Sequence, residues 1–270
     1  MRYALSPAGL ERLHEWLSHR PLLAFDIDGT LAPIVSRPWD ARVPGAVQSD
    51  LAILSEWTVV AVVTGRAVAD AKPMLGFTPR YLIGNNGAEG VPGYEAQALE
   101  FARICRSWIE QLCGPDEPWR SIPHLTLEDK TSTLAFHYRH AKHKDAVERL
   151  VEERAQCLVP QPTLLEGKFV LNLMPPGAPQ KGEAMPVLLR YSACDRAIYV
   201  GDDVSDEAVF RLRSPALLTV RIERVRSSAA ELYLKNQAEV PRFVGELARI
   251  ARAEREELSL QATERRARRA

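Results

Sequence analysis

The chain has little cysteine, no excess of either charge and no long apolar run. Its four cysteines show no C-x-x-C spacing, so they predict reduced structural thiols rather than a metal site. Lysine plus arginine and aspartate plus glutamate both number 35, and the resulting zero net charge favours neither nucleic acid nor an anionic membrane. No apolar run reaches the roughly 20 residues that a transmembrane helix needs. We therefore expect no nucleic-acid or membrane partner.

The N-terminus also lacks the basic region and apolar core that are typical of a signal peptide. Hydrophobic residues make up 46% of the chain and charged residues 26%, which is ordinary for a globular protein. A length of 270 residues allows one domain with a large insert, or two domains. These properties predict a cytoplasmic protein.

The most informative segment is an apolar run at residues 21–31 that stops at Asp26 and Asp28, with Gly29 and Thr30 in its continuation. A continuous apolar run is typical of a buried strand in a parallel sheet. The carboxyl end of such a strand is where open α/β sheets place their ligands. Two carboxylates beside a flexible glycine suit a nucleophile, a metal ligand and a proton donor that act on one phosphate group. The ordinary alternative is a strand that ends in an Asx turn.

Two further strand-like runs end in residues that a phosphate site needs. Residues 58–63 end in Thr64, where a hydroxyl and the backbone N–H groups at a helix start form an anion site. Residues 197–200 lead through Gly201 to acidic side chains that repel one another unless a cation compensates them: Asp202, Asp203, Asp206 and Glu207. A capping threonine and a solvated acidic turn are the ordinary alternatives.

Lys181 opens a predicted helix after the proline-rich residues 174–180, and a lysine there can bind a phosphate as a point charge. Alone, it is an ordinary lysine. From Asp26 to Asp206, the series Asp-x-Asp-Gly-Thr, Thr, Lys and Gly-Asp-Asp-x-x-Asp resembles the ordered motifs of the haloacid-dehalogenase superfamily of phosphotransferases. The resemblance covers the whole predicted catalytic part of the chain.

The resemblance implies a catalytic role for four of these residues. Asp26 is the expected nucleophile, which forms an aspartyl-phosphate. Asp28 is expected to protonate the leaving oxygen and then to deprotonate the water that hydrolyses the intermediate. Spacing alone does not order these two roles. Thr64 and Lys181 are expected to hold the phosphoryl oxygens.

The same resemblance implies a Mg²⁺ site, since the nucleophile and the substrate are both anionic. Asp26, Asp202 and the backbone carbonyl of Asp28 are the expected ligands, and Mg²⁺ prefers such oxygen atoms. Asp206 is expected to bind a water on the metal, and Asp203 to brace the site.

The pattern of strands and helices predicts an α/β fold with a Rossmann-like parallel sheet. Apolar strands alternate with helical patterns in residues 1–103 and again in residues 180–250, which form the predicted catalytic core. The predicted elements of its first half are a helix at 8–18, a strand at 21–26, a helix at 44–54, a strand at 58–63, a helix at 66–75 and a strand at 81–84.

Residues 104–179 break this alternation and predict an inserted α+β cap, which would select the substrate by its leaving group. The predicted cap elements are strands at 124–129 and 132–139, a helix at 141–155 and a hairpin at 164–172 joined at Glu166–Gly167. Residues 251–270 are rich in both charges and predict a frayed helical tail.

The cap carries Glu128-Asp129-Lys130-x-Ser132, then His137-Tyr138-Arg139, then Gly167-Lys168. With the aspartate motifs of the core, these segments resemble trehalose-6-phosphate phosphatases. The resemblance implies hydrolysis of trehalose 6-phosphate to trehalose and phosphate in trehalose biosynthesis, with a trehalose-phosphate synthase acting upstream. The substrate contacts that it implies are Gly65, Arg66, Asn86, Glu89, Lys130, Ser132, His137, Arg139, Lys168 and Asn172.

Three residues depart from that family pattern. Asn86 stands where the family usually has histidine, Asn172 where it usually has glutamate, and Ser205 where it usually has threonine. The first two positions belong to the sugar cleft, and asparagine carries no charge there. Three alternatives stay open: a phosphatase for another glycosyl phosphate, such as glucosylglycerol or glucosylglycerate phosphate, a sugar phosphomutase, and a non-catalytic partner of a trehalose-synthesising enzyme.

Overall fold

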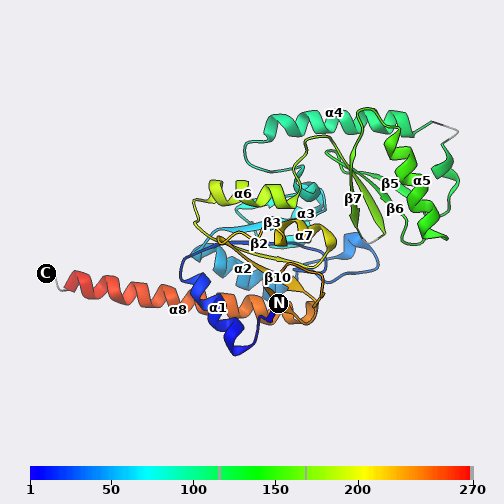
Figure 1. Cartoon of the computed structure of the whole chain (residues 1–270). Coiled ribbons are helices and arrows are strands. Elements are labelled where there is room, and N and C mark those ends of the chain that lie inside the picture. Colours follow the sequence, from blue (N-terminus) through cyan, green and yellow to red (C-terminus); the bar gives the residue numbers. More distant parts are fainter. Residues whose placement is uncertain (115–116, 168, 268–270) are drawn as a thin grey trace.

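The computed structural model describes residues 1–114, 117–167 and 169–267 (Figure 1). Two sheets organise the chain, one of seven strands and one of four. In Figure 1 the smaller sheet and the helix α4 lie above the larger sheet, and the end of α8 projects from the opposite side of the molecule.

The larger sheet is parallel throughout and has the strand order β1-β11-β10-β9-β2-β3-β4. Its central strands are buried at every position because helices cover both faces. This confirms the predicted α/β fold with a parallel sheet. The strands are β1 (Arg2–Tyr3), β2 (Leu22–Phe25), β3 (Val60–Val63), β4 (Tyr81–Ile83), β9 (Ala197–Gly201), β10 (Leu217–Ile222) and β11 (Leu232–Leu234).

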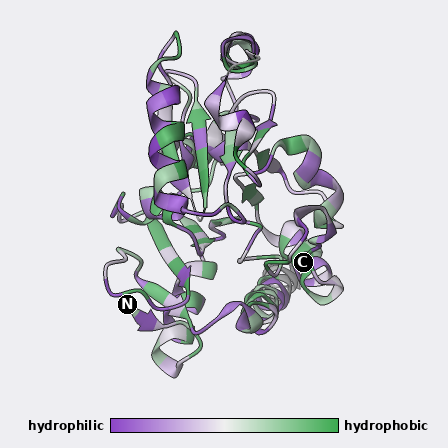
Figure 2. Ribbon diagram, turned by 90° about the vertical axis from the view of Figure 1, so that its right-hand side faces the viewer, coloured by the Kyte–Doolittle hydropathy of each residue, from purple (hydrophilic) through white to green (hydrophobic). Residues whose placement is uncertain are grey.

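Two apolar clusters fill the space between this sheet and its helices. Leu23 and Phe25 of β2 face one cluster, and Leu22 and Ala24 face the other, as the alternation of side chains along a strand requires. The first cluster is covered by α1 (Pro7–Leu17), α2 (Gly45–Trp57), α3 (Val68–Leu75) and α8 (Val240–Ala267), and the second by α6 (Lys181–Ser192) and α7 (Glu207–Phe210). In Figure 2 the strands are mostly hydrophobic, whereas the helices alternate between hydrophobic and hydrophilic bands.

The smaller sheet is antiparallel, with the order β5-β6-β8-β7, and it packs with two helices around a separate apolar cluster. Its elements are α4 (Glu95–Leu112), β5 (Thr126–Asp129), β6 (Leu134–His137), α5 (Lys144–Gln156), β7 (Thr163–Gly167) and β8 (Val170–Met174). We call this part the cap. Helix α4 runs without a break through residue 103, where the sequence places the end of the core.

One predicted turn is wrong. The sequence places the turn of the cap hairpin at Glu166–Gly167, but both residues belong to β7, and Gly167 pairs with Val170 at the start of β8. Strand β7 therefore continues through both residues of the predicted turn. A glycine in a strand pattern suggests a turn, but here it occupies an ordinary extended position.

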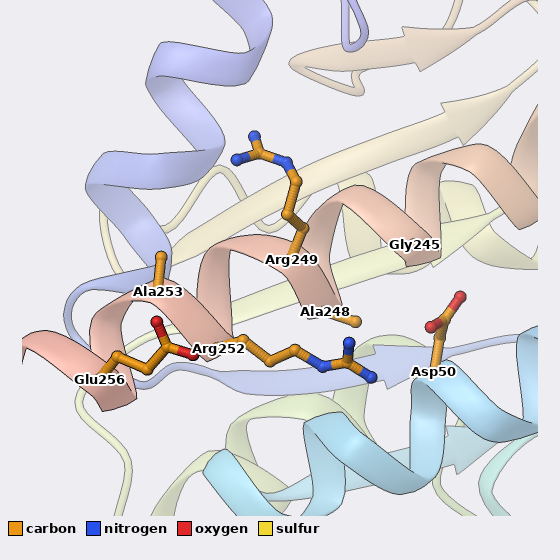
Figure 3. A pocket seen from close by; sticks show the side chains of 7 residues that line it. All are labelled: Asp50, Gly245, Ala248, Arg249, Arg252, Ala253 and Glu256. Carbon is orange, nitrogen blue, oxygen red and sulfur yellow. The ribbon is translucent and has the colours of Figure 1, made fainter.

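The predicted tail begins within a helix of the core, which continues to Ala267. Helix α8 begins at Val240, and its residues up to Ala251 pack in the apolar cluster against α1 and α2. A surface cavity of about 310 Å³ lies between α2 and α8, lined by Asp50 of α2 and by Arg252 and other residues of α8 (Figure 3). None of the predicted site residues lines it.

Within the described residues, every helix is too short or too polar to cross a bilayer. The four cysteines, Cys105, Cys113, Cys157 and Cys194, are all free.

Candidate active site

The predicted catalytic residues gather at the carboxyl edge of the larger sheet. Asp26 follows β2, Thr64 follows β3, Asn86 lies just beyond β4 and Asp202 follows β9. These four strands are neighbours in the order β9-β2-β3-β4. Because parallel strands end at the same edge, the four segments meet there.

Lys181, the first residue of α6, joins two of the aspartates. Its ammonium Nζ lies 3.1 Å from Oδ1 of Asp26 and 2.8 Å from Oδ1 of Asp206. Burial lowers the pKa of Lys181, but the charges of Asp206 and Asp26 outweigh it and raise the pKa above its usual value. The ammonium is therefore charged at neutral pH and lies beside the predicted nucleophile.

Asp206 is fully buried, and both its carboxylate oxygens accept hydrogen bonds. Lys181 and the hydroxyl of Tyr199 donate to Oδ1, the latter at 2.6 Å. The backbone N–H groups of Asp202 and Asp203 donate to Oδ2, both at 2.9 Å. With both oxygens engaged in this way, Asp206 is suited to hold Lys181 and the loop of Asp202 rather than to bind a metal directly.

One carboxylate oxygen from each of Asp26, Asp202 and Asp206 lies within 4.8 Å of the others. With Asp206 engaged by its hydrogen bonds, Asp26 and Asp202 are the two carboxylates here that could bind a metal ion directly. Burial, followed by the charge of Asp206, raises the pKa of Asp202 to about 7, although its Oδ1 accepts a 3.0 Å hydrogen bond from Thr30. Burial also raises the pKa of Asp26 well above its usual value, and Lys181 offsets this only in part. Buried carboxylates that resist ionisation in this way fit a divalent cation with a preference for oxygen ligands.

Gly29 permits the close approach of these groups. It has a φ of +80°, and a Cβ at this position would lie 2.2 Å from Oδ2 of Asp202. Any side chain there would displace the Asp202 carboxylate, so the glycine of the first motif is required for the geometry of the metal site.

Arg66 forms an ion pair with Asp28. Its Nε and Nη2 atoms each donate a 2.6 Å hydrogen bond to one carboxylate oxygen of Asp28. This paired geometry orients the carboxylate that is predicted to act as acid and base. Thr64 is buried beside them, and its hydroxyl oxygen accepts a 3.3 Å hydrogen bond from the backbone N–H of Arg66.

The cap reaches this edge through Lys130, which follows β5. Its Nζ donates to the carbonyl of Gly65 at 3.1 Å and to Oδ1 of Asn172 at 3.4 Å, and it lies 3.7 Å from Glu128. Burial lowers the pKa of Lys130, and the charge of Glu128 offsets this in part. His137 Nε2 lies 2.6 Å from the same Glu128 carboxylate. The structure thus brings Gly65, Lys130, Asn172 and His137 into one cluster between core and cap.

The other predicted substrate contacts are placed less uniformly. Asn86 is buried beside Gly65: a Cβ added to Gly65 would lie 3.2 Å from Oδ1 of Asn86. Glu89 instead accepts hydrogen bonds from the backbone N–H of Val68 and from Asn85, at 2.9 and 3.0 Å. Its carboxylate therefore holds the start of α3.

Three predicted contacts lie in or near the cap. Ser132 is buried, and its backbone N–H donates to the carbonyl of Lys130 at 2.8 Å. Arg139 is exposed and makes no hydrogen bond to another candidate in the part of the chain that the structure describes. Lys168 lies outside the described residues.

Sequence reasoning missed three residues that shape the site: Thr30, Asn85 and Tyr199. Thr30 is the threonine of the first motif, and its place in that motif could have indicated a role in the site. Tyr199 lies in an apolar run, where its buried hydroxyl requires a partner, and a tyrosine three residues before an acidic cluster is a usable clue. For Asn85 the sequence shows only a turn-like Asn-Asn pair.

Comparisons with known proteins agree with this geometry. The trehalose-phosphatase family model matches residues 24–238. A trehalose-phosphate phosphatase of Mycobacterium marinum is 31% identical over 242 residues, which cover 85% of this chain and 62% of that protein. A bifunctional trehalose-6-phosphate synthase/phosphatase of Thermoproteus tenax is 32% identical over 212 residues, which cover 75% of this chain and 28% of that protein.

A solved structure shows the same fold. The C-terminal domain of a C. albicans trehalose-6-phosphate phosphatase matches with a TM-score of 0.73 and 20% identity, over 92% of this chain and 98% of that one. The chain spans about 62% of the length of the mycobacterial relatives that it matches. Because the family model covers most of the chain, from β2 to beyond β11, the chain belongs to the trehalose-phosphatase family.

Proposed function

We propose that this protein is a Mg²⁺-dependent phosphatase that hydrolyses trehalose 6-phosphate to trehalose and phosphate. The observation that carries the proposal is the contact of Lys181 with Asp26 beside the Asp202 carboxylate, at the edge that Lys130 of the cap also reaches. The names of the family and of the mycobacterial relative support the choice of substrate.

In the first step, an oxygen of Asp26 attacks phosphorus and the bond from phosphorus to the sugar oxygen breaks. Asp28 gives its proton to that leaving oxygen, so trehalose departs as a neutral alcohol. Lys181 and the Thr64 hydroxyl bind the oxygens of the transferring group. Asp26, Asp202 and the carbonyl of Asp28 would hold Mg²⁺, which would supply the positive charge that lets two anions approach each other.

In the second step, Asp28 takes a proton from a water molecule as that water attacks phosphorus. The bond from phosphorus to Asp26 breaks, and the Asp26 carboxylate and inorganic phosphate are released. In the free protein Arg66 binds the Asp28 carboxylate. An incoming phosphate dianion offers Arg66 a second anion to bind, which would leave Asp28 free to exchange its proton.

A second candidate function is a phosphatase for another glycosyl phosphate. The observation that favours it is the state of Asn172, whose Oδ1 accepts from Lys130 and whose Nδ2 donates to the carbonyl of Leu165 at 3.1 Å. Both ends of this amide are engaged within the cap. At this position Lys130 therefore meets an amide, where the family usually has a carboxylate.

Phosphate release from a panel of sugar phosphates tests the proposal. The panel contains trehalose 6-phosphate, glucose 6-phosphate, sucrose 6-phosphate and glucosylglycerol phosphate, each with and without Mg²⁺. We expect the kcat/KM for trehalose 6-phosphate to exceed that for the others by at least about tenfold, since one misplaced polar contact costs that much. A higher kcat/KM for another member would favour the second candidate, and a need for a bisphosphate activator would identify a phosphomutase.

Mg²⁺ affinity should rise with pH. A carboxylate must lose its proton to bind a metal, and the pKa of Asp202 is about 7 in the metal-free protein. Below pH 7 each unit of pH should therefore weaken binding by at least about tenfold, and the raised pKa of Asp26 should add to this dependence. Titration calorimetry of EDTA-treated protein at several pH values measures this, and proton release on binding is its second sign. If the Mg²⁺ affinity does not change between pH 5.5 and 8, the assignment of Asp202 as a ligand is wrong.

Two parts of the proposal concern the cell. A trehalose-phosphate synthase is the proposed upstream enzyme, and the T. tenax relative, whose name joins a synthase to a phosphatase, supports this. The cytoplasm is the proposed location, and four free cysteines fit a reducing compartment.

A further inference from the structure

Asn85 lies between the core and the cap and is fully buried. It follows β4 with a φ of +51°, a left-handed conformation that asparagine adopts more readily than most residues. Its backbone N–H donates to the carbonyl of Arg66 at 2.7 Å, and the backbone N–H of Asn86 donates to the carbonyl of Thr64 at 2.9 Å. The main chain at Asn85 is thereby fixed to the loop of residues 64–66, which we call the phosphate loop.

The Asn85 side chain binds the cap. Its Nδ2 donates to the carbonyl of Lys130 at 2.9 Å and to the Glu89 carboxylate at 3.0 Å. Its Oδ1 accepts from the hydroxyl of Thr133 at 3.2 Å. All the hydrogen-bonding atoms of this amide are therefore engaged, and two of the three bonds cross from core to cap.

The two cap residues that Asn85 contacts are the ends of one turn, residues 130–133. The backbone N–H of Lys130 donates to the carbonyl of Thr133 at 3.0 Å, and that of Ser132 donates to the carbonyl of Lys130 at 2.8 Å. One asparagine side chain therefore holds both ends of this turn against the core.

The turn determines where the Lys130 ammonium lies. A lysine stem has four flexible carbons, so its main-chain anchor sets how far and in which direction it reaches. Here the ammonium lies 3.1 Å from the carbonyl of Gly65 in the phosphate loop. Asn85 thus binds the phosphate loop through its main chain and the base of the cap lysine through its side chain.

We propose that Asn85 is a positioning residue that fixes the turn at 130–133 on the phosphate loop, and that it thereby sets the preference for phosphates with a sugar leaving group. The inference rests on the proposed function as a sugar phosphatase. Asn85 acts through Lys130, because the Asn85 side chain is itself fully buried in the protein. A small aryl phosphate has no sugar for the cap to bind, so its hydrolysis reports the core alone.

The variant that tests this is Asn85→Gly, which keeps the left-handed backbone and removes the amide. Thr133→Val removes one of the three bonds with little change of shape. Asn236→Gly, at an exposed asparagine whose side chain makes no hydrogen bond in the described structure, is the matched control. Each protein is assayed with its best sugar phosphate from the panel and with p-nitrophenyl phosphate. Amide hydrogen exchange of the free proteins is measured alongside.

For Asn85→Gly we expect kcat/KM for the sugar phosphate to fall about tenfold or more, mainly through KM, while kcat for p-nitrophenyl phosphate stays within about twofold. Thr133→Val should lower kcat/KM for the sugar phosphate by a smaller factor and should also leave kcat for p-nitrophenyl phosphate nearly unchanged. Asn236→Gly should change neither value. The amides of Lys130 and Ser132 should exchange at least about tenfold faster in Asn85→Gly, while those of β2 and β3 keep their protection.

An equal loss on both substrates, or unchanged exchange at residues 130–133, would overturn the inference. The exchange measurement needs no substrate, so it tests whether Asn85 fixes the turn even if trehalose 6-phosphate is not the substrate. If the wild-type protein instead fails to hydrolyse trehalose 6-phosphate while the amides of Lys130 and Ser132 still exchange faster in Asn85→Gly, that result would count against the proposed function alone.

Discussion

Asp26→Asn is expected to lower kcat by at least roughly 10⁴-fold and to leave the fold intact. An amide has the shape of the carboxylate but is a far weaker nucleophile toward phosphorus. The pKa of Asp26 is raised well above its usual value by burial, which means that the folded protein disfavours a charge at this position. A neutral amide should therefore be tolerated, since Lys181 keeps Asp206 as its partner at 2.8 Å, and the variant should remain folded at the assay temperature.

Two measurements check this prediction. Initial rates of phosphate release give kcat, and acid quenching with ³²P-labelled substrate shows whether label remains on the protein. The wild type should retain label transiently and Asp26→Asn should retain none. Asp195→Asn, at an exposed aspartate, is the matched control and should behave as the wild type. Label on the Asp26→Asn protein would show that another residue is the nucleophile.

The centre of the sheet could be predicted because it consists of continuous apolar runs. Residues 22–25 and 60–63 are buried at every position, and each run ends in a polar motif that marks its carboxyl end. Strands β1 and β11 have two and three residues, which is too short for any periodic pattern to be visible. They join the sheet only because the chain brings the two segments together at its edge.

Helix α4 was not predicted, although its pattern of apolar residues is visible in the sequence. Phe101, Cys105, Trp108 and Leu112 are buried at spacings of four, three and four, which is typical of one helical face. The predicted domain limit at residue 103 cut this pattern in two. The domain limits themselves stay a prediction.

The position of the candidate site followed from the sequence, but the pairing of its side chains did not. Parallel strands bring their carboxyl ends to one edge, so motifs at those ends must meet. The contact of Arg66 with Asp28, and the use of Glu89 to hold the start of α3, depend on side-chain conformations across tens of residues. Spacing along the chain carries no information about such contacts. The role of both residues as substrate contacts stays a prediction.

Lys181→Met should combine the loss of activity with a loss of stability. The ammonium is nearly completely buried between the carboxylates of Asp26 and Asp206, and methionine keeps its length without its charge. Removing one member of a buried ion pair costs about 3–5 kcal/mol of the free energy of unfolding, because the remaining charge has no partner. The transferring phosphoryl group also loses a cation, so kcat should fall by about 10²-fold or more.

The destabilisation in Lys181→Met should depend on pH. Without the lysine, nothing offsets the burial that raises the pKa of Asp26, so this carboxyl keeps its proton in the folded state at a pH where the unfolded chain has released it. The folded state then holds more protons, so stability falls as pH rises and recovers as pH falls toward 5. Urea unfolding at pH 5 and pH 8 measures this, with exposed Lys72→Met as the control. A deficit of the same size at both pH values would mean that lost packing rather than the unpaired carboxylates destabilises the variant, and it would remove the electrostatic role assigned to Lys181.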